Sequence, residues 1–322
     1  MIKRTIILCL ILSSILNAIG QSPNIDSNNT KYSYPFYFLY DKKVKKLESY
    51  SLSELIVKSN SELRSLTSSK NPYVRCESFM ILAENKDSMV FEILLKHLTD
   101  AEIVKTKGGC VISHSFVGDI FINCVRGLTS YDLNLEQESK LDSALIFFEN
   151  VNLYAKNRLL KNLQPRPKYH ERLREIVLKE KNSVALIPIS RYRLEADIEI
   201  INKHLKHKKE LYNAIYASKE FPNENLKPQL IKIYKKFWSE DLYSYSEWRI
   251  LIQAMIQYED NEIHELFSMI VSTSDGFRYQ NLGSYLKIAL IKYPNSFYSD
   301  LVDKINLEPY YKEQVKKEIN WD

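Results

Sequence analysis

Apolar residues recur at helical spacing along most of the chain. The first clear stripe lies in residues 51–66 and consists of Leu52, Leu55, Ile56, Leu63 and Leu66. Ser51 and Glu54 stand at its start with the spacing of a capping box, in which the Glu54 carboxylate can accept from the backbone N–H of Ser51. The pattern predicts a helix that begins at Ser51 and continues to residue 66.

Further stripes follow with the same period and their own start signals. Asn71 and Pro72 suit the N-cap and first turn of a helix. No segment alternates apolar and polar residues as a half-buried strand does. Glycine is scarce, with 7 in 322 residues, against about 7% in an average protein. We therefore expect an all-α fold of about a dozen helices joined by short polar links.

A longer repeat underlies these helices. Four segments each contain the end of an apolar helix, a polar turn and a new amphipathic helix, namely 79–98, 187–205, 252–270 and 287–305. Their equivalent positions Ala83, Tyr192, Tyr258 and Tyr293 are separated by 109, 66 and 35 residues, close to three, two and one units of about 35. This period is typical of helical solenoids, in which stacked units share one continuous core.

Part of this repeat resembles a known family. Residues 71–85 (NPYVRCESFMILAEN) resemble the second helix of a HEAT repeat, with Arg75 in its Val-Arg pair, and residues 94–104 (LLKHLTDAEIV) resemble the first helix that follows, with Asp100 at its usual Asp position. The resemblance covers about residues 50–127 and continues downstream only as a period. It implies an armadillo-type, HEAT-like α-α superhelix of exported bacterial type that acts as a scaffold, and it implies no reaction.

The chain departs from the HEAT pattern after Val104. A HEAT repeat would continue into its next helix, but this sequence first inserts TKGGCVISH. Gly108 and Gly109 can adopt the positive φ angles of a tight turn, so we expect one short hairpin-like excursion near 103–113. Helical pattern returns at Ser115, and Gly127 is placed to end that helix.

Two cysteines lie in this region, and three interpretations of them remain open. Catalysis by Cys110 would need His114 in hydrogen-bond contact and a third group, such as Asp119, to orient the imidazole. A disulfide between Cys110 and Cys124 would close a loop of about 14 residues, worth about 3 kcal/mol in the chain-entropy model. Otherwise Cys124, like Cys76, is a small buried hydrophobe. We predict that Cys110 and Cys124 lie within bonding distance and that Cys76 is unpaired.

The N-terminus has the pattern of a secretory signal peptide over residues 1–20. Lys3 and Arg4 precede an apolar run that ends in small residues, which predicts cleavage before Gln21. An uncleaved anchor is the alternative, but the apolar run is shorter than the ~20 residues of a spanning helix. We therefore expect an exported protein, periplasmic or extracellular, with no transmembrane segment in the mature chain. Without Lys3 and Arg4, 43 basic and 40 acidic residues remain, and this balance gives no reason to expect nucleic-acid binding.

An extended leader, 21–47, precedes the helical pattern. It contains the aromatic segment YSYPFYFLY at 32–40, in which Tyr34, Phe36 and Tyr37 either contact a partner or cover the open apolar edge of the first repeat. After it, residues 48–320 are expected to form a single HEAT-like solenoid domain.

A basic, proline-kinked segment at 163–174 is a second candidate contact. Its cations are Arg166, Lys168 and Arg172, and the alternative is an exposed loop between helices without a partner.

Motifs for catalysis and metal binding are incomplete. His264-Glu265 and His170-Glu171 begin like the zinc-binding HExxH helix but lack its second histidine. The acidic pairs Glu240-Asp241 and Glu259-Asp260 suggest, as an alternative, an α/α-barrel hydrolase that cleaves glycans with paired carboxylates. We expect instead a non-catalytic scaffold or adaptor, without cofactor or metal, that binds a protein or peptide of the cell envelope on its solenoid surface.

Overall fold

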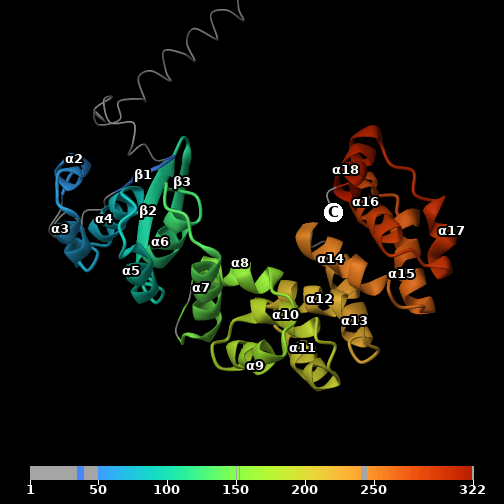
Figure 1. Ribbon diagram of the computed structural model, residues 1–322. Coiled ribbons are helices and arrows are strands. Elements are labelled where there is room, and N and C mark those ends of the chain that lie inside the picture. The colour runs from blue at the N-terminus through green and yellow to red at the C-terminus, as the bar shows by residue number, and fades with distance from the viewer. Residues whose placement is uncertain (1–34, 40–49, 150, 152, 241–244, 321–322) are drawn as a thin grey trace, which may run out of the picture. The chain divides into compact units, whose positions relative to one another are not determined.

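The described part of the protein is mostly helical, as expected. A computed structural model describes residues 35–39, 50–149, 151, 153–240 and 245–320, which form seventeen α-helices and one small sheet (Figure 1). The chain divides into two compact units, Met1–Leu141 and Asp142–Asp322. Within the described residues, no helix combines the length and the apolar character needed to cross a bilayer.

Short capped helices open the first unit. The single helix expected over 51–66 is in fact two, α2 (Leu52–Ile56) and α3 (Asn60–Leu66). The cause is a second capping box. The Ser59 N–H donates to Glu62 Oε2 at 2.9 Å, just as the Ser51 N–H donates to Glu54 Oε2 at 2.6 Å, so a new helix begins at residue 60.

The next two helices carry the core of the first unit. Asn71 caps α4 (Pro72–Glu84) by accepting from the N–H of Tyr73 at 3.0 Å, as the sequence predicts. This helix is buried nearly all round, which is typical of a core helix. Phe79 of α4 stacks on Phe121 of α6 (Val117–Val125), with ring centroids 3.9 Å apart. Helix α5 (Val90–Lys96) packs against both.

A three-stranded antiparallel sheet interrupts the helices of this unit. The expected excursion is a hairpin of β2 (Ile103–Gly108) and β3 (Val111–Phe116), with Gly109 at φ +56° in its turn. It is longer than predicted, and the helix resumes at Val117 rather than Ser115. Strand β1 (Tyr37–Phe38) pairs with the other edge of β2, which gives the order β1-β2-β3.

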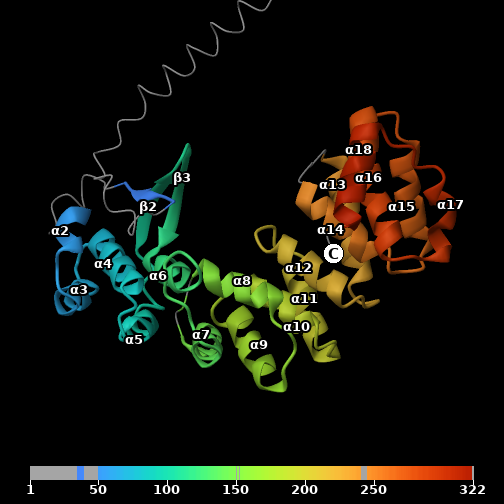
Figure 2. The same cartoon turned by 45° about the horizontal axis from the view of Figure 1, so that its top comes forward.

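The second unit is built of helix pairs. Its first helices are α7 (Leu135–Phe147), which begins before the unit boundary, and α8 (Tyr154–Asn162). Five helices form a row in which each packs on the next: α10 (Leu186–Ser190), α12 (Leu211–Glu220), α14 (Tyr245–Met255), α16 (Gly276–Lys292) and α18 (Pro309–Ile319). Four other helices each pack on the next helix of that row (Figures 1 and 2): α9 (His170–Leu178), α11 (Ile198–His204), α13 (Lys227–Ser239) and α15 (Asn261–Ser272). Helix α15 also contacts α17 (Ser299–Val302).

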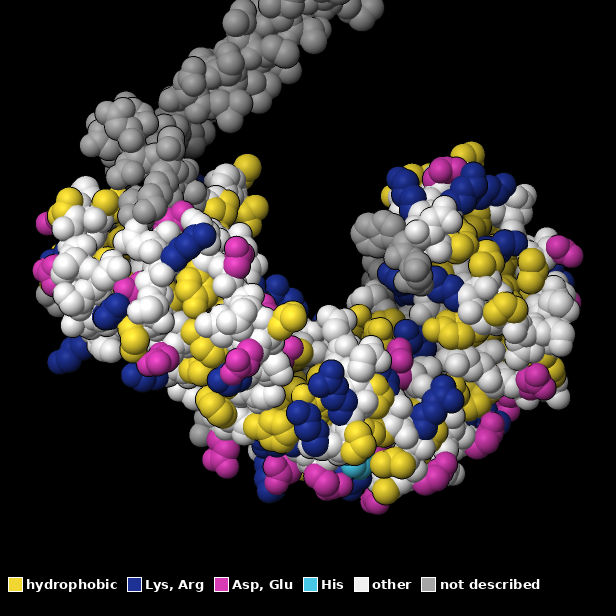
Figure 3. Space-filling model, in the orientation of Figure 1, with side chains coloured by type: hydrophobic (Ala, Val, Ile, Leu, Met, Phe, Trp, Pro, Cys, Tyr) yellow, Lys and Arg dark blue, Asp and Glu magenta, His cyan; other side chains and the backbone are white. Residues whose placement is uncertain are grey.

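One hydrophobic core runs through these pairs, from Ile146 to Val315. Basic and acidic side chains are interspersed on the surface that Figure 3 shows. The helices outnumber the expected dozen, in part because the second capping box divides residues 51–66 into α2 and α3. Four short 3₁₀ turns each run directly into the helix that follows. The turns are η3 (Pro167–Tyr169), η4 (Ser183–Ala185), η5 (Glu195–Asp197) and η6 (Ser296–Tyr298).

Two tyrosines at equivalent positions of the sequence repeat have the same structural role. The Tyr192 hydroxyl accepts from the N–H of Arg166 at 2.9 Å and donates to its carbonyl at 2.7 Å. The Tyr258 hydroxyl does the same with Asn223, at 3.0 and 3.1 Å. Each ring therefore ties the end of one helix to an earlier loop, 26 residues back for Tyr192 and 35 residues back for Tyr258. Tyr293, the third member of this set, has a different environment, described below.

Candidate functional site

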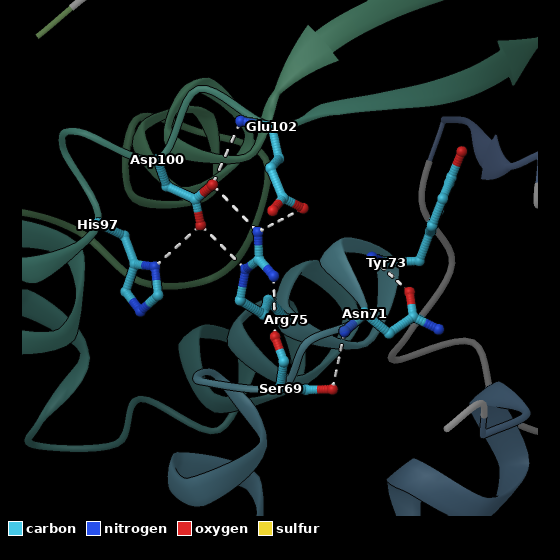
Figure 4. A network of polar contacts seen from close by, with 7 residues as sticks. All are labelled: Ser69, Asn71, Tyr73, Arg75, His97, Asp100 and Glu102. Carbon is cyan, nitrogen blue, oxygen red and sulfur yellow. Dashed lines mark hydrogen bonds and ion pairs between the residues drawn. The ribbon is translucent and has the colours of Figure 1, made fainter. Parts of the chain in front are cut away.

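Arg75 and Asp100, two of the residues that carry the HEAT resemblance, meet in a polar network (Figure 4). Arg75 donates to Asp100 through Nε at 2.9 Å and through Nη2 at 3.0 Å, and it also donates to the carbonyl of Ser69 at 2.8 Å. His97 Nδ1 lies 3.2 Å from Asp100, and Glu102 lies 3.1 Å from Arg75. Burial acts to raise the pKa of Asp100, but hydrogen bonds from His97 and Arg75 outweigh it and lower the pKa. Arg75 contacts both carboxylates of the network, so the network fixes the base of the hairpin on α4.

The cysteines do not form the expected disulfide. Cys110 is exposed in the hairpin turn, whereas Cys76 in α4 and Cys124 in α6 are fully buried, and all three are free. The whole of β3 separates Cys110 from α6, and six strand residues span about 20 Å, whereas a disulfide needs Cα atoms within about 7 Å. Burial raises the pKa of Cys124 well above its usual value. Asp119 is also buried while His114 is exposed, so no Cys-His-Asp set is assembled.

The described part of the aromatic leader packs on the first unit. Phe36 and Phe38 contact edge to face at 5.6 Å, and Phe38 meets Tyr73 in the same way at 5.7 Å. The Tyr73 hydroxyl donates to the carbonyl of Leu39 at 2.9 Å. Tyr37 is the member of this group that remains exposed. Tyr34, the predicted signal peptide and the remainder of the leader lie outside the described residues.

The three cations of the basic segment 163–174 differ in exposure. Arg166 and Lys168 are exposed, as a contact surface requires. Arg172 is not, because it donates to the carbonyl of Ile146 at 2.9 Å and pairs with Glu175 and Glu180.

Arg172 lines a cavity of about 850 Å³ whose charges are matched among its own residues. Beside it the fully buried Lys156 donates to Glu180 at 2.6 Å, and Lys179 donates to Glu175 at 2.8 Å. Burial lowers the pKa of Lys156, and the contact with Glu180 opposes this. Lys156, Arg172 and Lys179 are each paired with a carboxylate of this network, and we interpret it as structural.

The histidines and the acidic pairs singled out in the sequence have structural partners. His170 Nε2 lies 2.8 Å from Asp197 and His264 Nε2 lies 2.8 Å from Asp300. Asp260 caps α15 and pairs with Lys227 at 3.0 Å, whereas Asp241 lies outside the described residues. Among the described residues, no three or more His, Cys, Asp or Glu side chains form a cluster able to hold a metal ion.

A cleft on α12, α14 and the end of α16 has a different character. We call it the tyrosine cleft; it has a volume of about 230 Å³ and is lined by Tyr212, Tyr216, Lys219, Ser246, Arg249, Ile250, Gln253, Lys292 and Tyr293. The residues from α12 stand at i, i+4 and i+7, and those from α14 at i, i+3, i+4 and i+7, so each helix presents one face. Three cations line the cleft, and among the described residues no carboxylate does.

The cations of the cleft are held by aromatic and acidic neighbours. Lys219 Nζ lies 4.2 Å from the centre of the Tyr216 ring and 3.3 Å from Glu220. Burial acts to lower the pKa of Lys219, but Tyr293, Tyr216 and Glu220 together raise it, so the ammonium group stays charged. Arg249 pairs with Glu318 at 2.6 Å through Nε and is still 44% exposed, which leaves guanidinium donors available.

The remaining lining groups add uncharged donors. Burial raises the pKa of Tyr212, so this phenol keeps its proton at neutral pH. Gln253 is only 6% exposed, and it lines the cleft with a neutral amide that can both donate and accept. The cleft is therefore rich in donors and suited to an anionic, acceptor-rich ligand.

Sequence reasoning missed this cleft. Its signal was the recurrence of polar residues at helical spacing on two successive helices, Tyr-x₃-Tyr-x₂-Lys and Ser-x₂-Arg-x₃-Gln. On a single helix such a pattern is typical of a solvated face, and only the packing of α12 on α14 brings the two together.

Comparison with known proteins gives no relative to guide the assignment. No family model, no curated protein and no solved structure matches the chain.

Proposed function

We propose that the protein is an exported, non-catalytic scaffold that binds an acidic segment of another protein, with the tyrosine cleft as its anchoring site. The observation that carries the proposal is the donor-rich lining of that cleft. Lys219, Arg249 and Lys292 supply positive charge, and Gln253 supplies a neutral amide donor. Charge-assisted hydrogen bonds of this kind favour carboxylates.

The size of the cleft favours an anchor point over a complete small-molecule site. Sites for drug-sized ligands occupy about 300–1,000 Å³, whereas this cleft has about 230 Å³. Its volume suits one acidic side chain or a chain terminus whose remainder lies outside. A protein or peptide of the cell envelope meets this description.

The row of packed helices from α10 to α18 also supports a binding role. We infer that α10 to α18 and their partners form a HEAT-like α-solenoid, because they pack in succession and Tyr192 and Tyr258 repeat one contact. Solenoids present extended surfaces that bind other chains. The step from this fold to binding is an analogy, and the cleft gives it a specific location.

The alternative, an α/α-barrel hydrolase, fits the described carboxylates less well. A glycosidase of this kind keeps one carboxyl protonated by raising its pKa. In the 850 Å³ cavity, hydrogen bonds from Lys179 and Arg172 instead lower the pKa of Glu175. Glu180 is paired with Lys156 and Arg172.

An affinity capture from the native envelope fraction tests the proposal. The cleft variant carries Lys219→Gln with Arg249→Gln, and a matched control carries Lys161→Gln with Lys317→Gln, which are exposed and lie outside the cleft. We expect the wild type and the control to retain the same partner and the cleft variant to lose it, with all three melting alike. Equal capture by both variants, or turnover of a glycan by the wild type, would show the proposal to be wrong.

A further inference from the structure

A second hollow of the Asp142–Asp322 unit has a different chemistry. We call it the lysine groove; it has a volume of about 410 Å³ and is lined by Leu205, Lys206, Lys208, Leu211, Gln229, Lys232, Ile233, Lys236, Phe237 and Glu240. It lies where the loop between α11 and α12 meets one face of α13. Both segments belong to the same unit and the same hydrophobic core.

The pattern of α13 explains why apolar and cationic groups meet here. Ile233 and Phe237 follow Lys232 and Lys236 by one position each, so the apolar pair faces inward while the lysines stand at its margin. Ile233 and Phe237 are largely buried and Lys232 and Lys236 are exposed. The result is an apolar floor with cations along its rim.

The opposite side of the groove repeats this arrangement. Leu205 and Leu211 bracket the connecting loop and add to the floor, and between them Lys206 and Lys208 are exposed.

The positive charge of the rim is in excess. Glu240 is the single carboxylate among the described residues of the lining, and it lies 3.9 Å from Lys236. Lys206, Lys208 and Lys232 make no ion pair with any described residue. This differs from the 850 Å³ cavity, where neighbouring acids match the cations.

We propose that the lysine groove binds a single-chain amphiphilic anion, a fatty-acid-like molecule whose hydrocarbon tail lies on Leu205, Ile233 and Phe237 and whose anionic head lies among the lysines. The volume of about 410 Å³ falls in the range of small-molecule sites. Lysine side chains suit such a ligand because their methylene stems cover apolar surface while their ammonium groups reach the anion. This site is independent of the tyrosine cleft and of the function proposed for it.

The test is a calorimetric titration with decanoate, below the concentration at which it forms micelles. We expect decanoate to bind, and decanol (no charge) and butyrate (short tail) to bind at least tenfold more weakly. Within the series from octanoate to decanoate, each added methylene is expected to raise affinity about fourfold. Equal affinity for decanoate and butyrate would overturn the proposal.

Two double variants locate the binding. Lys232→Gln with Lys236→Gln changes two exposed rim residues and is expected to weaken decanoate binding at least tenfold. Lys203→Gln with Lys209→Gln removes the same charge from exposed positions outside the groove and is expected to leave affinity within twofold. If both variants bind like the wild type, the groove is not the site. The variant of the tyrosine cleft should still bind decanoate, which separates this result from the fate of the proposed function.

Competition with lipid vesicles distinguishes two sources of such a ligand, the acyl chain of a membrane lipid and a free amphiphile. If phosphatidylglycerol vesicles displace decanoate and phosphatidylcholine vesicles do not, the source is the acyl chain of an anionic lipid. If neither displaces it, the ligand is a free amphiphile. Displacement of decanoate by hexaglutamate, or vesicle binding without decanoate binding, would show that the groove recognises charge alone and would refute the proposal.

Discussion

At the residue scale, Arg75 of α4 joins the segment that precedes α4 to the segment that precedes the hairpin. Its guanidinium group contacts Ser69 before α4 and both Asp100 and Glu102 before the hairpin (Figure 4). The side chains of Arg75 and Asp100 are 8% and 14% exposed. At this depth, loss of one partner leaves the other charge poorly solvated, so the pair matters more than a surface ion pair does.

We predict that Arg75→Met destabilises the protein by about 3 kcal/mol, because the Asp100 carboxylate loses its bidentate partner while still largely buried. Urea unfolding at pH 7 measures this. The matched control is Lys140→Met, whose ion pair with Glu136 is 62% and 74% exposed and whose loss should cost less than about 1 kcal/mol. Equal effects of the two changes would mean that the network of Figure 4 does not hold the hairpin base.

The free thiols give a second prediction at this scale. Cys110 is exposed and Cys76 and Cys124 are buried, so an alkylating reagent should modify Cys110 in the native protein and the other two only after denaturation. Peptide mapping without reductant distinguishes the sites. Recovery of a peptide that links Cys110 to Cys124 would restore the disulfide expected from the sequence.

At the element scale, the hairpin and the leader strand depend on Tyr73. Its hydroxyl donates to the carbonyl of Leu39 and accepts from the N–H of Lys105 at 3.3 Å, which links β1 and β2 to α4. We predict that Tyr73→Phe destabilises the protein by about 1–2 kcal/mol and accelerates hydrogen exchange in β2. Tyr37→Phe, at an exposed position of β1, is the control and should leave exchange unchanged. Unaltered exchange in the Tyr73 variant would show that strand pairing alone holds the sheet.

The elements also show what sequence patterns can and cannot predict. The helical class and the start of α4 at Asn71-Pro72 follow from local signals, because caps and apolar stripes act within one helix. The division at Ser59 was visible as a second Ser-x₂-Glu box, but the apolar stripe that continued to Leu66 concealed it. The glycine turn indicated a hairpin, but the length of β3 had no signal, since Val111 to His114 are all exposed and no buried face imposed alternation.

The candidate sites were less predictable than the elements. The HEAT resemblance singled out Arg75 and Asp100 as matching positions, but their bidentate contact became visible only in the structure. The lining of the tyrosine cleft comes from helices more than 25 residues apart in the sequence, and nothing local reveals that they meet. Arg172 appeared to be a surface cation because its partners Ile146 and Glu180 are set by packing.

At the scale of the whole molecule, paired carboxylates in both units link stability to pH. The pKa values of Asp87 and Asp100 in one unit and Asp260 in the other are lowered, and that of Asp300, beside Lys304 and His264, is about 2. A lowered pKa contributes stability that is present above the unfolded value of about 4 and is lost as pH falls through the folded value. We therefore predict constant melting temperatures from pH 7 to 5 and a steep fall below pH 4.

Thermal melting by circular dichroism measures this, and it also bears on the prediction of a single solenoid domain over 48–320. A chain with one shared core should melt in one transition that shifts as a whole. Two transitions, of which Arg75→Met moves only one, would show that the two compact units unfold separately. Stability that stays flat to pH 3 would contradict the role given to the paired carboxylates.

The central claim is that the tyrosine cleft binds an acidic chain. Fluorescence anisotropy with labelled hexaglutamate tests it most directly. We expect saturable binding by the wild type that weakens as salt rises from 50 to 300 mM, as charge-assisted contacts require. The Lys219→Gln, Arg249→Gln variant should bind at least tenfold more weakly, since each charge-assisted hydrogen bond contributes about 1.5–3 kcal/mol, and the Lys161→Gln, Lys317→Gln control should bind normally. Equal binding by the two variants, or no binding by the wild type, would contradict the account.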